Sequence, residues 1–102
     1  MATLESLVEA IEERSEALGT LGYKVRFDLA EGGSILVDAT GPQAVITTDG
    51  GEADTVLKMK SDNLKKLIEG RLNPMIAFST GRLKVQGSQG VALKLAGLLD
   101  SN

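Results

Sequence analysis

The side chains that could carry out chemistry are few in kind. The sequence of 102 residues contains no cysteine and no histidine. Without cysteine there are no disulfides, thiolate zinc sites or thiol nucleophiles. Without histidine the usual general base near neutral pH and the commonest metal ligand are also absent. An enzyme built on this chain would have to work with Asp, Glu, Lys, Ser or Tyr alone.

Two pairs of neighbouring side chains are the best catalytic candidates. Asp54 precedes Thr55, and Asp62 follows Lys58 by four residues, so each pair sets an acid near an alcohol or an amine. Neither pair has an evident third group to orient it. No glycine pair is followed by the Lys-Ser or Lys-Thr of a phosphate loop. We therefore predict a protein that is not an enzyme, with no catalytic residue, no metal and no cofactor.

The charges are unevenly distributed along the chain. Residues 1–57 hold three basic and eleven acidic side chains, a net charge of −8, whereas residues 58–94 hold eight basic and two acidic ones, a net of +6. A basic segment attracts anionic head groups or phosphates. Arg82 and Lys84 are the candidates to contact such an anionic group. The alternative is that these cations are simply solvated.

Composition limits the class of protein and its partners. A chain of 102 residues fits a single domain over 1–102. The chain as a whole is acidic and has only three aromatic residues, which argues against a nucleic-acid partner. No apolar run approaches the ~20 residues of a membrane span. The first residues are glutamate-rich and lack the basic start of a signal peptide, so we expect a cytoplasmic protein.

The first half of the chain is predicted to form a helix and three strands. Apolar residues at helical spacing indicate a helix over about 3–18. Alternation of apolar and polar residues predicts strands over about 23–29, 35–40 and 43–48. The short connections between these strands favour an antiparallel meander.

The second half is predicted to form a strand, two helices, a strand and a last helix. The fourth strand covers about 53–60, and Ser61 or Asp62 is expected to cap the helix that follows. Pro74 is suited to the first turn of a short apolar helix, and about 82–86 alternates as a fifth strand.

The last helix, about 89–99, is apolar around most of its circumference. Val91, Leu95, Leu98 and Leu99 form one stripe, and Leu93, Ala96 and Gly97 add a second apolar or small flank. Such a helix is normally buried on more than one side. The second flank must therefore meet another helix, a partner chain, a ligand or water.

These residues resemble the sterol carrier protein 2 domain, a lipid-binding α/β family. The resemblance covers roughly the second half of the chain in detail, while the first half agrees in the order of its elements. The residues that carry it are Ala53-Asp54-Thr55, Asp62, Leu64, Leu67, Gly70-Arg71-Leu72-Asn73-Pro74, Ala77-Phe78, Gly81-Arg82-Leu83-Lys84-Val85, Gly87 and Ala92-Leu93-Lys94-Leu95.

The resemblance implies an α/β fold of the α+β type. Its features are a five-stranded, mostly antiparallel sheet, helices packed on one face, and an apolar tunnel between sheet and helices that the last helix covers. The chain ends in Asp100-Ser101-Asn102 and not in the Ser-Lys-Leu type of peroxisomal address that some members carry. The residues that we expect to line the tunnel are Ile35, Val37, Leu67, Met75, Ile76, Phe78, Leu83, Val91, Leu95 and Leu98.

The expected function is non-catalytic binding of a long-chain lipid, with transfer as an extension of binding. The ligand is expected to be a fatty acid, a fatty acyl-CoA or a sterol-like molecule. A transient contact with an anionic membrane surface is a further candidate, and the protein is expected to be a monomer or a weak homodimer. The alternative is an interaction module with a filled core that acts as an accessory of lipid or quinone biosynthesis.

Overall fold

A single five-stranded sheet forms the centre of the molecule. The computed structural model describes residues 3–48 and 50–99. The strands lie in the order β3-β2-β1-β4-β5, and β1 pairs with β4 in parallel whereas the other three pairs are antiparallel. This confirms the predicted five-stranded, mostly antiparallel sheet. The strands are β1 Lys24–Leu29, β2 Ser34–Asp38, β3 Val45–Thr47, β4 Thr55–Met59 and β5 Leu83–Gly87.

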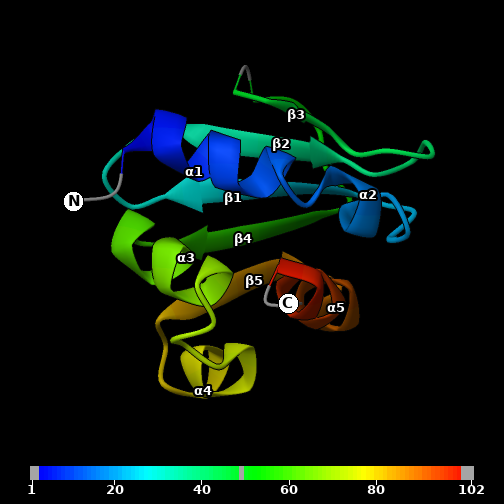
Figure 1. The fold of residues 1–102 in the computed structure, drawn as a ribbon. Helices are drawn as coiled ribbons and strands as arrows, with labels where there is room; N and C mark the ends of the chain where they lie inside the picture. Colours follow the sequence, from blue (N-terminus) through cyan, green and yellow to red (C-terminus); the bar gives the residue numbers. More distant parts are fainter. Residues whose placement is uncertain (1–2, 49, 100–102) are drawn as a thin grey trace.

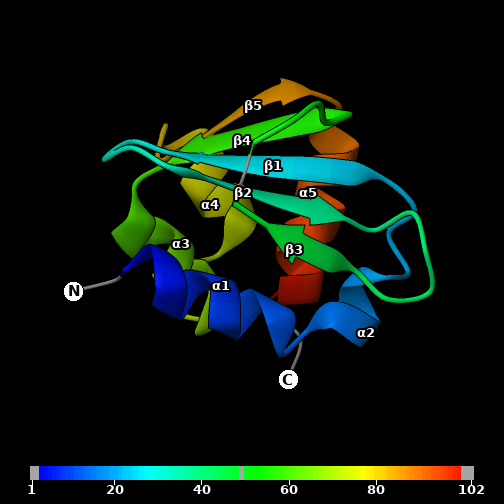
Figure 2. The ribbon, with the colours of Figure 1, turned by 90° about the horizontal axis from the view of Figure 1, so that it is seen from above.

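The helices cover one face of this sheet, as Figures 1 and 2 show. This arrangement confirms the predicted α+β fold class. The prediction of one domain over 1–102 extends past the described residues and stays a prediction. The helices are α1 Leu4–Glu12, α2 Ser15–Leu18, α3 Ser61–Ile68, α4 Pro74–Ser79 and α5 Gln89–Leu99.

The single helix predicted over 3–18 is wrong in one respect, because the structure has two helices there. Arg14 interrupts the run with φ −108° and ψ 17°. Its guanidinium donates hydrogen bonds to the carbonyl oxygens of Leu99 (2.7 Å), Ala10 (2.9 Å) and Ile68 (3.2 Å). These carbonyls lie in the last turns of α5, α1 and α3, where the backbone has no helical donor for them. Thr3 caps α1 as a capping box with Ser6.

The start of α3 also differs from the prediction. Neither Ser61 nor Asp62 is its N-cap, and the N-cap residue Lys60 makes no side-chain capping bond. The carboxylate of Glu31 performs this task from the β1–β2 turn. It accepts hydrogen bonds from the Ser61 backbone N–H (3.0 Å) and the Ser61 hydroxyl (2.8 Å). These two bonds lower the pKa of Glu31.

The core lies between the inner face of the sheet and the helices. Alternation along the strands places Phe27, Val37 and Leu57 toward the helices, and each is fully buried. Thr55 is the one buried polar residue on that face among the described residues, and its hydroxyl has no hydrogen-bond partner there. The helices contribute the buried side chains Leu7, Ile11, Leu18, Leu64, Leu67, Ile68, Ala77, Ala92, Leu95, Ala96 and Leu99.

Helix α5 packs on the sheet through small residues. Its buried stripe runs through Ala92, Leu95, Ala96 and Leu99, while Val91, Leu93 and Leu98 are half-buried at its margins. Alanines at the contact let a helix come close to the surface beneath it. Within residues 3–48 and 50–99, no helix combines the length and the apolar character needed to cross a membrane.

Candidate functional site

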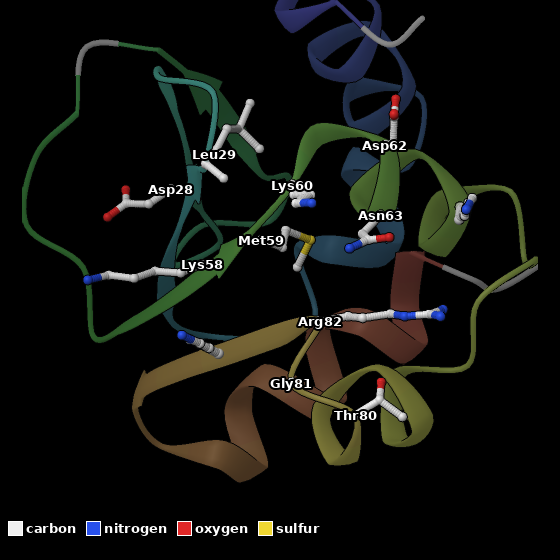
Figure 3. A pocket seen from close by; sticks show the side chains of 13 residues that line it. Asp28, Leu29, Lys58, Met59, Lys60, Asp62, Asn63, Thr80, Gly81 and Arg82 are labelled. Atoms are coloured by element: carbon white, nitrogen blue, oxygen red, sulfur yellow. The ribbon is translucent and has the colours of Figure 1, made fainter.

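A cavity of ≈ 880 Å³ opens at one end of the sheet, where β1 and β4 end and β5 begins. The start of α3 and the turn between α4 and β5 complete its wall (Figure 3). Its lining residues are Asp28, Leu29, Ala30, Lys58, Met59, Lys60, Asp62, Asn63, Lys66, Thr80, Gly81, Arg82 and Lys84.

Strand register brings the outer residues of this cavity together. Lys58 of β4 is paired with Asp28 of β1 on one side and with Lys84 of β5 on the other. Arg26 engages the Asp28 carboxylate at 2.8 Å. Lys58 and Lys84 are therefore neighbours, and the Asp28 carboxylate beside Lys58 already has Arg26 as its cationic partner. This leaves the outer wall positively charged.

The inner wall comes from the helices and the turn before β5. Lys60, Asn63 and Lys66 are supplied by the β4–α3 junction and by α3. The turn between α4 and β5 is closed by the backbone N–H of Arg82, which donates a hydrogen bond to the Ala77 carbonyl oxygen at 2.9 Å. The side chain of Arg82 then extends between α3 and α4 (Figure 3).

The cavity combines a positive wall with an apolar one. Five cations and two carboxylates line it, for a net charge of +3. Among the described residues, none of the five cations makes a side-chain hydrogen bond or an ion pair; Lys60 acts at longer range and contributes to the lowered pKa of Glu31. The Met59 and Leu29 side chains lie beside these cations in Figure 3. Such a site suits a ligand with an anionic head and an aliphatic tail.

The predicted site residues fall into three groups. Arg82 and Lys84 line the cavity, and their contact with a head group stays a prediction. Eight of the predicted tunnel residues lie wholly or partly in the core, five of them at most 1% exposed and three half-buried. Met75 and Ile76 are instead exposed on α4, at 61% and 55%. The five deeply buried residues are Ile35, Val37, Leu67, Leu83 and Leu95, and the half-buried ones are Phe78, Val91 and Leu98.

The tunnel itself stays a prediction. No residue of α5 lines the cavity at the sheet end. A second hollow of ≈ 520 Å³ near the β2–β3 connection is lined by Asp38, Thr40, Gly41, Pro42, Gln43 and Val45, so it too lies away from α5.

Sequence reasoning missed Lys58, Lys60, Lys66 and Met59 as site residues. The basic character of 58–94 signalled the cations, but only strand register shows that Lys58 and Lys84 are adjacent. Met59 follows a regular strand alternation, which is equally typical of plain core.

The two candidate catalytic pairs have different surroundings. Asp54 accepts a hydrogen bond from the Lys24 backbone N–H at 2.9 Å, and the Thr55 hydroxyl is buried. Asp62 and Lys58 line the cavity without a hydrogen bond between them. Within the described part of the chain, no group of three acidic side chains is placed to hold a metal ion.

Comparison with known sequences identifies a family match and longer relatives. The model of the SCP-2 sterol transfer family matches residues 4–100. Hydroxysteroid dehydrogenase-like protein 2 of Bos taurus is 29% identical over 98 residues, which cover 94% of this chain and 22% of that protein. Sterol carrier protein 2 of Rattus norvegicus is 31% identical over 93 residues, covering 85% of this chain and 17% of the rat protein. The chain thus spans about a fifth of the length of these relatives.

Solved structures share the fold. Sterol carrier protein 2 from Yarrowia lipolytica, in its apo form, superposes with a TM-score of 0.75 at 23% identity, covering 92% of this chain and 87% of that one. The sterol carrier protein domain 2 of Helicoverpa armigera gives 0.71 at 28% identity, covering 93% and 80%. Palmitated SCP2L2 from Aedes aegypti gives 0.68 at 17% identity, covering 99% and 96%. The first and third likenesses, under 25% identical, show the fold alone.

Proposed function

Because the chain belongs to the SCP-2 sterol transfer family, we propose that it binds a long-chain lipid with an anionic head group and does not convert it chemically. The family implies lipid binding or transfer in general terms. The ligand class is our inference: a fatty acid or a fatty acyl-CoA is favoured over an uncharged sterol.

One observation carries the proposal. The cavity at the sheet end brings five cations together with Met59 and Leu29, and none of these cations has an ion-pair partner among the described residues. A carboxylate or phosphate would lie against Lys60, Lys66 and Arg82, where a bidentate Arg contact gives orientation as well as charge. The aliphatic chain would leave the head group past Met59, whose flexible thioether adapts to varied shapes.

The aliphatic chain of the lipid would continue into the predicted tunnel beneath α5. Leu83 pairs with Met59 across β4 and β5 and is 1% exposed, so the route from cavity to core begins at these two residues. Leu67 and Leu95 fill the space beyond at 1% and 0% exposure. Entry of a lipid therefore requires α5 to move outward from the sheet.

The energetics allow this rearrangement. Burying ~14 methylenes at ~0.8 kcal/mol each gives roughly 11 kcal/mol. Association costs at least ~4 kcal/mol, and displacement of α5 adds to that cost. Before the cost of moving α5 is subtracted, the remainder is at most ~7 kcal/mol, which corresponds to a dissociation constant of roughly 10 μM.

A titration of delipidated protein with a fluorescent fatty acid tests the proposal. We expect saturable binding with one site, and weaker binding in the variant Lys60→Gln/Arg82→Gln. The methyl ester of the same fatty acid should bind the wild type and the variant equally, since it lacks the charge. Lys24→Gln, an exposed cation at the opposite end of β1 from the cavity, is the matched control and should behave as wild type. No saturable binding at roughly tens of micromolar would refute the proposal.

A second candidate is an interaction module whose core is filled. The observation in its favour is that Ile35, Val37 and Leu95 are each 0% exposed beneath the helices. This reading predicts that fatty acids leave the unfolding temperature unchanged. The chain matches 22% of the length of the Bos taurus relative, so the activity named for that protein is not assigned to this chain.

A further inference from the structure

We propose that α4 docks the protein on an anionic lipid bilayer, with Met75 and Ile76 inserted at the interface. This inference goes beyond lipid binding in the cavity, because a surface can dock whether or not the cavity holds a ligand. Helix α4 lies at the edge of the molecule in Figure 1, away from β3. At six residues, it is far too short to span a bilayer, so its contact would be confined to the interface.

The exposed apolar side chains of α4 form one outward patch. Met75 and Ile76 are 61% and 55% exposed, while Ala77 is 1% exposed and Phe78 is half-buried against the core. At 100° per residue Met75, Ile76 and Ser79 share the outward side of the helix. Asn73 fixes this first turn, because its side-chain oxygen accepts hydrogen bonds from the Met75 N–H (2.8 Å) and the Ile76 N–H (3.4 Å). The helix therefore presents two large aliphatic side chains on a backbone that is already ordered.

Three cations flank this patch. Arg71 precedes the helix, and its N–H donates to the Lys66 carbonyl at 2.8 Å, which holds the two residues on one connection. Arg82 follows the helix and extends between α3 and α4. The nearby acids are Glu69, which lies 3.9 Å from the exposed Arg71 guanidinium, and Asp62 across the cavity. Aliphatic side chains with cations in the segments before and after the helix match a bilayer with anionic head groups.

Charge distinguishes this patch from the other exposed apolar residues. Tyr23 and Val45, at 45% and 59% exposure, lie in the segment 1–57, whose net charge is −8. An anionic surface would repel that segment and attract 58–94, whose net charge is +6. The charge separation thus selects α4 over Val45 as the contact.

Docking through α4 would direct the cavity toward the bilayer. Lys66 and Arg82, two of the three cations named above, also line the cavity. A lipid leaving the bilayer would meet the cations of the cavity without first crossing bulk water.

Co-sedimentation with vesicles tests the docking surface. We expect the protein to bind vesicles that contain phosphatidylglycerol, to bind pure phosphatidylcholine vesicles weakly, and to dissociate from the former as salt is added. Met75→Ser/Ile76→Ser should weaken binding roughly tenfold or more, because it removes the apolar contact. Arg71→Gln should weaken it roughly fivefold at low salt, the value of one cation near such a surface. Circular dichroism and the unfolding temperature verify that each variant is folded.

Two controls make the result decisive. Val45→Ser removes an equally exposed aliphatic side chain and Lys24→Gln removes an exposed cation, both in the acidic segment, and neither should affect vesicle binding by more than twofold. The proposal is overturned if Met75→Ser/Ile76→Ser binds like wild type, or if Val45→Ser weakens binding as much. A dimer in native mass spectrometry that disappears in Met75→Ser/Ile76→Ser, together with no vesicle binding, would also overturn it. Fatty-acid titration of the same variant separates docking from the proposed function, since cavity binding should persist.

Discussion

Arg14 holds the ends of three helices together through one guanidinium group. Its three hydrogen bonds reach carbonyls of α1, α3 and α5, at positions 4, 54 and 85 residues away in the sequence. Nothing in the local sequence indicates this role, because an arginine on the polar side of a predicted helix usually faces solvent. The role depends on three helix ends meeting at one point, which only the tertiary structure shows.

We predict that Arg14→Ala lowers the free energy of unfolding by about 2–4 kcal/mol, because it leaves partly buried carbonyls without a donor. Arg14→Lys should recover little of this loss, since an ammonium cannot reproduce the planar fork. Urea unfolding measures the free energy of unfolding of both variants. Arg71→Ala is the control, because that side chain is 74% exposed, and it should cost less than about 0.5 kcal/mol. Equal losses for Arg14→Ala and Arg71→Ala would contradict this role for Arg14.

Glu31 gives the protein a pH-dependent contact at the start of α3. Its pKa is lowered by the Ser61 backbone N–H and hydroxyl. A carboxyl with a lowered folded-state pKa stabilises the fold above its unfolded pKa, and this contribution is lost as the pH falls through the folded pKa. Glu31→Gln should therefore have a lower unfolding temperature than wild type near neutral pH, and the difference should fade in acid.

Thermal unfolding measured from neutral pH down into acid, with Glu52→Gln as the matched control, checks the Glu31 prediction. Glu52 is exposed and makes no hydrogen bond among the described residues. If the unfolding temperatures of Glu31→Gln and wild type differ by the same amount at every pH, the ionised Glu31 carboxylate is not the source of the lost stability.

At the scale of elements, sequence patterns located the strands and most of the helices. Alternation identified β1, β2 and β4, because each has one face in the core and one outside. The start of α3 was assigned to the wrong residue because its capping group, Glu31, lies 30 residues away in the sequence. The extent to which Leu98 and Val91 are covered likewise depends on how close α5 lies to its neighbours, which the helical pattern does not fix.

Helix α5 allows a test of whether the core opens for a lipid. Leu95→Ala removes a 0%-exposed side chain and should cost about 2–5 kcal/mol of stability. If an acyl chain enters beneath α5, it should fill the new cavity. We therefore predict that a fatty acid raises the unfolding temperature of Leu95→Ala by more than that of wild type.

Leu7→Ala is the matched control for this experiment. Leu7 is 2% exposed in α1, which packs mainly on α3 and β3. Leu7→Ala removes the same atoms as Leu95→Ala, but it lies away from the proposed lipid path. The fatty acid should therefore raise the unfolding temperature of Leu7→Ala only as much as that of wild type. An equal rise in both variants would contradict entry beneath α5, and no rise in either variant or in wild type would favour the filled-core module.

At the scale of the whole molecule, the two halves of the chain divide the charge. The opposition of −8 over 1–57 and +6 over 58–94 is visible in the sequence. Its consequence for the site is not visible there, because the cavity draws residues from β1, β4, α3 and β5. Arg82 and Lys84 were found from their charge, whereas the neighbouring Lys58 and Met59 became candidates only once the strand ends were placed side by side.

The family resemblance indicated the fold from residues that mostly begin and end elements. Asn73 and Pro74 start α4, as the sequence predicts, and Gly87 fits its site because an added Cβ would lie 2.7 Å from the Asp54 carbonyl oxygen. Residues of this kind determine where elements start and stop. They leave the ligand undetermined, since its choice depends on the cations and apolar side chains of the cavity.

Native mass spectrometry of the delipidated protein after equilibration with palmitate tests the central claim most directly. We predict one dominant species whose mass equals one chain plus one fatty acid, and a less abundant adduct formed by the uncharged methyl ester at the same concentration. A spectrum that shows only the bare chain, or adducts of several fatty acids in no fixed ratio, would contradict a single lipid site.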